Sequence, residues 1–162
     1  MKYIKKFRLF ENLESEIDLK ELEGLLIDFK QMGLDYDIKA GSSSVIDWNL
    51  FNDDKHGGPK VLRANEIDKY RKSFTNNSLT IEFTKNDYAY PYDINNTIEA
   101  YEMLKDYLFD NYDLIPNYIY RNYNWSYMYF EDFDKMELRS GDSWIKPENT
   151  FRAHKLTFGF YK

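Results

Sequence analysis

The hydrophobic periodicity of this chain changes twice from that of a helix to that of strands. Residues 15–33 are apolar at the helical spacing i, i+3, i+7 and i+10, at Leu19, Leu22, Leu26 and Phe29. Residues 94–110 show the same type of pattern, and alternating apolar and polar residues follow both segments. The sequence therefore predicts an α+β fold, a two-layer sandwich in which two main helices pack on an antiparallel sheet of about five to seven strands.

Capping and turn residues indicate where the predicted elements begin and end. Ser15, with Asp18 three residues later, resembles a capping box, and Gly33 suits a left-handed residue at the helix end. Polar loops are predicted at 52–60 and 86–93, and a short helix at 64–73. The predicted strands are a hairpin over 34–50, then Leu79–Phe83, the segment 118–129, Phe133–Leu138 and Lys155–Tyr161.

The segment 118–129 is the most unusual one in the chain because its aromatic residues alternate. Tyr118 and Tyr120 are in one phase and the later rings in the other, so we expect a β-bulge or turn at Arg121 and Asn122. The alternation allows the later rings to be core against the helices or an exposed aromatic platform. Because interfaces favour tyrosine and tryptophan, the candidate protein-binding residues are Tyr118, Tyr120, Tyr123, Trp125, Tyr127 and Tyr129.

Several catalytic classes are excluded by what the sequence lacks. There is no cysteine, which excludes disulfides, cysteine nucleophiles and thiolate metal sites. Phosphate-binding glycine loops, HExxH, GxSxG and EF-hand motifs are also missing from the sequence. His56 lies near Asp53 and Asp54 in a glycine-rich loop, which fits a solvated turn, and nothing in the sequence joins His154 to a nucleophile. We therefore predict no catalytic residues, no metal and no cofactor.

Acidic residues leave one enzymatic alternative open. Asp37-Ile38-Lys39 has the acid-x-lysine spacing used by metal-dependent nucleases, and Glu131, Asp132 and Asp134 could contribute oxygen ligands to a hard cation. Both groups also fit a solvated surface.

The charge of the chain bears on its partners. A net charge of −6 disfavours a phosphate backbone, so we expect no nucleic-acid partner. No window approaches 18 consecutive apolar residues, so we expect no membrane partner. A protein partner remains, and the oligomeric state stays open.

Residues 1–11 differ from the remainder, 12–162, which we expect to be one α+β domain. They carry a net charge of +3, which leaves −9 for the rest of the chain. This asymmetry suggests a basic leader, although the alternation from Tyr3 to Phe10 also fits an edge strand.

The opening MKYIKKFRLFE resembles the openings of many uncharacterised small proteins of tailed phages with Bacteroidetes-type hosts. It is also similar to the capsid-targeting leaders of T-even-like phages, which begin Met-Lys, carry an aromatic residue near position seven and end in Leu/Ile-x-Glu. Leu9-Phe10-Glu11 fits that ending, and the resemblance implies cleavage by a prohead protease between Glu11 and Asn12. The resemblance covers about eleven residues, and it bears on origin and destination rather than on activity.

These observations leave three hypotheses for function. The first is a non-enzymatic tailed-phage accessory protein that is packaged in the virion. The second is a small acidic protein that binds and inhibits a host defence factor through its aromatic surface. The third is a carboxylate-metal enzyme. The first two place the protein in the virion or the host cytoplasm.

Overall fold

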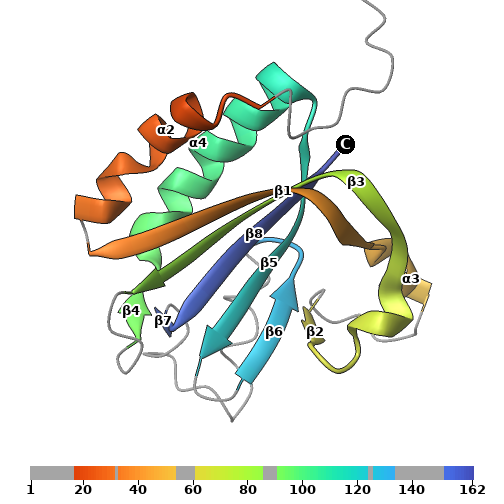
Figure 1. Ribbon diagram of the computed structural model, residues 1–162. Coiled ribbons are helices and arrows are strands. Elements are labelled where there is room, and N and C mark those ends of the chain that lie inside the picture. The colour runs from red at the N-terminus through yellow and green to blue at the C-terminus, as the bar shows by residue number, and fades with distance from the viewer. Residues whose placement is uncertain (1–16, 32, 54–60, 86–90, 124–125, 134–151) are drawn as a thin grey trace, which may run out of the picture.

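The computed structural model describes residues 17–31, 33–53, 61–85, 91–123, 126–133 and 152–162 (Figure 1). The elements in chain order are α2 (Leu19–Gln31), β1 (Leu34–Ile46), α3 (Trp48–Asp53), β2 (Val61–Arg63), the 3₁₀ helix η1 (Ile67–Tyr70), β3 (Arg71–Lys85), β4 (Tyr92–Asp93), α4 (Asn95–Tyr112), β5 (Ile115–Tyr123), β6 (Ser126–Phe130), β7 (Arg152–Ala153) and β8 (Lys155–Tyr161).

Within this part of the chain, six strands form one antiparallel sheet in the order β1-β3-β8-β5-β6-β2, and β4 pairs with β7 in a small second sheet. α2 and α4 lie along one face of the large sheet (Figure 1). A hydrogen bond of 3.1 Å from the Asp18 amide to the Tyr112 hydroxyl joins the start of α2 to the end of α4. The predicted α+β sandwich of helices on an antiparallel sheet is confirmed.

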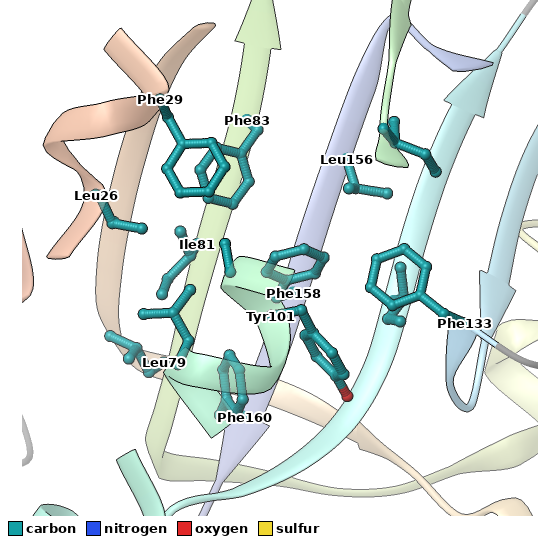
Figure 2. Close-up of a cluster of buried hydrophobic side chains, with 14 of the residues drawn as sticks. Leu26, Phe29, Leu79, Ile81, Phe83, Tyr101, Phe133, Leu156, Phe158 and Phe160 are labelled. Atoms are coloured by element: carbon teal, nitrogen blue, oxygen red, sulfur yellow. The ribbon is translucent and has the colours of Figure 1, made fainter. Parts of the chain in front are cut away.

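The main core lies between the two helices and the sheet. Leu22, Leu26 and Phe29 of α2 are buried, and so are Tyr101, Leu104 and Leu108 of α4. Aromatic rings meet across this layer, with Phe29 against Phe83 at 4.8 Å and Tyr101 against Phe158 at 4.8 Å between ring centroids (Figure 2). Such tilted ring pairs add to the free energy gained by burying apolar area.

A capping aspartate and a glycine set the two ends of α2. Asp18 caps α2, because its side-chain oxygen accepts hydrogen bonds from the Lys20 and Glu21 amides. Ser15, predicted for this role, lies outside the described residues. Gly33 has φ of 78°, the predicted left-handed conformation after the helix. Leu19 was predicted on the buried face but is 45% exposed, because it stands at the first position of the helix.

The predicted hairpin over 34–50 is wrong. Residues 34–46 form the single strand β1, which pairs with β3, and α3 follows directly. The turn-like residues around Gly41 instead produce a register shift between Gly41 and Ser43, which bends the strand without reversing it. Of the helix predicted at 64–73, residues 64–66 form a turn, Ile67–Tyr70 form the one-turn η1, and the last three residues belong to β3.

The other predicted elements have mixed outcomes. The strands at Leu79–Phe83 and Lys155–Tyr161 and the helix at 94–110 are confirmed, in the first case within the longer β3. Of Phe133–Leu138, the structure describes Phe133 alone, which is not in a strand. No helix of the described residues has the length and apolar character needed to cross a membrane.

Candidate functional site

The two faces of the large sheet carry different side chains. The face toward α2 and α4 is mostly apolar, with Arg121 as its buried charged residue among those described. We call the face that these helices leave uncovered the open face. On β5, alternation sends Ile119 and Arg121 to the helix side and Tyr118, Tyr120 and Asn122 to the open face.

Four of the six predicted binding residues lie on the open face. β5 and β6 pair antiparallel with Tyr120 opposite Tyr129 and Asn122 opposite Tyr127. The Tyr129 ring contacts two neighbours, with ring centroids 5.3 Å from Tyr118 and 4.9 Å from Tyr120. Tyr127 is 40% exposed, whereas the other three are partly buried. The rings are therefore neither in the core under the helices nor a flat exposed platform.

The remaining two predicted residues do not join this group. Tyr123 is in the opposite phase, and its ring stacks on His154 at 5.8 Å between ring centroids. Trp125 lies outside the described residues. The phase change predicted at Arg121 and Asn122 is wrong, because pairing is regular from Ile119 to Tyr123. Tyr118 and Tyr120 lie on β5 and Tyr127 and Tyr129 on the antiparallel β6, while Tyr123 ends β5 on the other face of the sheet.

The open face is hollowed between β3, β8, β5 and β6. The cavity has a volume of about 310 Å³. We call it the tyrosine hollow, and its lining residues are Thr80, Glu82, Tyr118, Tyr120, Asn122, Tyr129, Lys155 and Thr157. β5 and β6 are consecutive in the chain, and the sequence indicated their tyrosines. β3 and β8 are distant from them in sequence, so the sequence gave no indication that their residues line the same cavity.

A small second cluster supports one side of the hollow. Ile46, Trp48, Leu62 and Ile67 bury one another, and Tyr118 and Tyr129 pack against them. Asn117 holds this cluster to β5, because its side chain accepts from the Ile46 amide at 2.8 Å and donates to the Ile46 carbonyl at 2.9 Å. Its own carbonyl accepts a hydrogen bond from the Trp48 indole.

Gly159 makes room for the Tyr118 ring. The two residues are opposite each other on β8 and β5. A Cβ at position 159 would lie less than 3.0 Å from three atoms of that ring, so a side chain there would push Tyr118 away. The glycine therefore fixes the tyrosine against the floor of the sheet.

An ion pair crosses the floor of the hollow. The Lys155 ammonium lies 2.8 Å from the Glu82 carboxylate, and both side chains are about a quarter exposed. Asp37 and Lys39 on the neighbouring β1 form another ion pair at 2.9 Å. The described charges of the open face are thus largely paired with opposite charges. The exposed surface of α4 is instead acidic, because the helix carries one lysine and exposes Glu99, Glu102, Asp106 and Asp110.

Burial raises the pKa of the phenol groups of the hollow. It raises the pKa of both Tyr118 and Tyr120 to about 12, with smaller contributions from Tyr129 and Glu82. It also raises the pKa of Tyr129, which the charge of Arg71 partly offsets. At neutral pH the hollow offers neutral hydroxyl donors and apolar ring surface beside a paired carboxylate and ammonium. These groups suit hydrogen bonding and packing rather than proton transfer, which needs a pKa near the working pH.

The other residues singled out in the sequence are dispersed. His56, Asp54 and Asp134 lie outside the described residues, as do Leu9, Glu11 and Asn12 of the processing site. Asp37 and Lys39 stand exposed on β1, far along the sheet from Glu131 and Asp132 after β6. The described part of the chain contains no group of three histidine, aspartate or glutamate residues placed to hold a metal ion.

Comparison with protein-family models gives no match, and neither do searches of curated proteins and of solved structures.

Proposed function

We propose that this chain is a non-enzymatic protein that binds a protein partner through the tyrosine hollow. The observation that carries the proposal is the convergence of Tyr118, Tyr120 and Tyr129 on an ion pair and hydroxyl groups in one cavity. Tyrosines combine a large apolar body with a polar tip and are enriched where partners bury a side chain. A hollow of about 310 Å³ accommodates an inserted side chain, and Tyr127 stands exposed beside it to extend the contact.

The charges suggest which kind of side chain would fit. Glu82 and Lys155 already satisfy each other, so an inserted full charge would have to compete with that pair. A neutral side chain with hydrogen-bonding groups would instead meet the hydroxyls of Thr80, Thr157 and the tyrosines. We expect an amide or hydroxyl side chain of the partner to occupy the hollow.

Site-specific cross-linking tests this proposal. A photoreactive phenylalanine analogue replaces Tyr127 beside the hollow, and in a matched protein it replaces Phe109, a 55% exposed ring on α4. In bacterial cells expressing the chain, we expect a protein cross-linked from position 127 and not from 109. Its purified form should bind Tyr120→Ala about 10- to 100-fold more weakly than wild type in calorimetry. Equal capture from both positions, or unchanged affinity, would refute a site in the hollow.

The N-terminal resemblance adds an origin to this proposal. We infer a tailed-phage accessory protein, in which residues 1–11 act as a capsid-targeting leader and the hollow engages a partner in the virion. The alternative partner is a host defence factor met in the infected cell. Mass spectrometry of purified phage particles separates them: a mature chain that begins at Asn12 is expected for a packaged protein, and its absence from particles favours the host factor.

A further inference from the structure

β1 forms one edge of the large sheet. It pairs with β3 along Leu34–Gly41 without a break, and no described strand lies on its other side (Figure 1). A long edge strand is a template for pairing with another strand, so natural proteins usually protect it.

The hydrogen-bond phase shows which backbone groups face this edge. The Lys162 amide donates to the Asn77 carbonyl at 2.9 Å, which makes these two a hydrogen-bonded pair between the ends of β8 and β3. Hydrogen-bonded and non-hydrogen-bonded pairs alternate in antiparallel sheets. Counting along the register, Ile81 directs its amide and carbonyl toward Phe158 on β8.

Ile38 lies opposite Ile81 on β1, and therefore the two form a non-hydrogen-bonded pair. The amide and carbonyl of Ile38 consequently point away from β3, toward the edge. By the same alternation, the amides and carbonyls of Tyr36 and Ala40 also point there. The edge thus presents three consecutive sets of donor and acceptor groups around Ile38.

The charged side chains of this edge are complementary to those of the same edge in a second, antiparallel copy. Asp37 and Lys39 flank Ile38 on the open face and are well exposed, at 67% for the lysine and 58% for the aspartate side chain. In an antiparallel pair of two β1 strands centred on Ile38, Asp37 of each copy lies opposite Lys39 of the other. These positions are non-hydrogen-bonded pairs, in which Cα atoms approach to about 4.5 Å and side chains are closest. Charges that usually protect an edge are attractive in this register.

α2 carries exposed apolar surface above the same edge. The Tyr36 hydroxyl donates to the Glu23 carbonyl at 3.4 Å, and the Lys30 ammonium lies 4.9 Å from the Tyr36 ring centroid. Ile27 lies between these two residues on the same stripe of the helix and is 55% exposed. One turn away, Gly24 has no atom within 4 Å of where its Cβ would be. Glycine inside a helix is unfavourable relative to alanine, so close approach of another helix would explain it.

We propose that two copies of this chain pair antiparallel through their β1 edges, centred on Ile38, which joins the two sheets and brings the two α2 helices together. The contact is isologous, as a two-fold axis requires. It uses the edge opposite to β2 and β6, and it does not depend on the function of the tyrosine hollow.

Sedimentation equilibrium of the full chain tests the pairing by reversing charges. Wild type should approach twice its mass of 19.6 kDa as concentration rises. Asp37→Lys and Lys39→Asp each place like charges opposite each other twice per dimer, and should weaken self-association by about 10- to 100-fold. Asp35→Lys is the matched control, because Asp35 lies opposite uncharged Gly41 of the other copy in this register. Its lysine would be only a diagonal neighbour of Lys39 of the other copy, so this substitution should weaken association much less than either reversal.

Mixing the variants gives the decisive result. Asp37→Lys and Lys39→Asp chains, mixed in equal amounts, should form a heterodimer, because each lysine then meets an aspartate. The double variant Asp37→Lys/Lys39→Asp should self-associate again for the same reason. Circular dichroism checks that each variant is folded. A monomeric wild type, an equal effect of Asp35→Lys, or failure of the mixture to associate would overturn the proposal.

Discussion

Alternation along β5 places neighbouring residues in opposite surroundings. Tyr120 lies in the tyrosine hollow, while Arg121 is 1% exposed on the helix side of the sheet. The guanidinium carbon of Arg121 lies 5.8 Å from the ring centroids of both Tyr123 and Phe130, where it gains cation–π attraction. Burial lowers the pKa of Arg121 to about 10. The strand thus buries a cation and leaves phenols on the open face, the reverse of the order that hydrophobicity alone predicts.

Ionisation of the phenols in the hollow makes the free energy of unfolding depend on pH in the alkaline range. Burial raises the pKa of Tyr118 and Tyr120 from 10.0 to about 12, so the unfolded chain releases these protons at lower pH than the folded chain. Their contribution is complete below pH 10 and is lost as pH rises toward 12. We expect the free energy of unfolding, measured with urea, to fall over this interval. In Tyr118→Phe/Tyr120→Phe the fall should be shallower, and an unchanged slope would contradict the assignment to these residues.

At the scale of elements, a β-bulge connects the hollow to its support. The pairing of β5 with β8 shifts between Pro116 and Tyr118, which leaves Asn117 as the extra residue. Freed from the ladder, its side chain bonds both backbone groups of Ile46 at the end of β1. The bulge therefore ties a central strand to the bent end of an edge strand and fixes the position of α3, which follows at Trp48.

Local sequence patterns predicted the helices and strands better than they predicted which strands pair with one another. The faces of α2 and α4 and the strand at Lys155–Tyr161 follow from spacing within one segment, so the sequence was sufficient for them. The residues around Gly41 indicate a bend, but their composition fits a turn as well as a β-bulge. Because β1 pairs with the long β3 on both sides of Gly41, the bend is a bulge. Glu82 and Lys155 meet only because β3 and β8 are neighbours, and no local pattern encodes that non-local pairing.

On the scale of the whole molecule, the buried residues form two clusters of unequal size. The main cluster joins α2, α4 and the central strands, and the small cluster joins the ends of β1 and α3 to β2 and η1. The two share no buried residue. Tyr118 and Tyr129, which pack against the small cluster, also line the hollow. The site therefore lies where a large, strongly buried unit meets a small one, and the smaller unit should open at lower free energy.

Matched leucine substitutions test this division. Leu62 in the small cluster and Leu156 in the main cluster are 1% and 0% exposed, and a buried Leu→Ala change costs about 2–5 kcal/mol. By hydrogen exchange, Leu62→Ala should reduce protection of amides in β2, η1 and α3, while α4 and β8 keep theirs, because the main cluster loses no contact. Leu156→Ala should reduce protection in both regions, since global unfolding exposes every amide. Equal loss in α4 and β2 for Leu62→Ala would mean that the two clusters unfold as one unit, and the hollow would then be as rigid as the core.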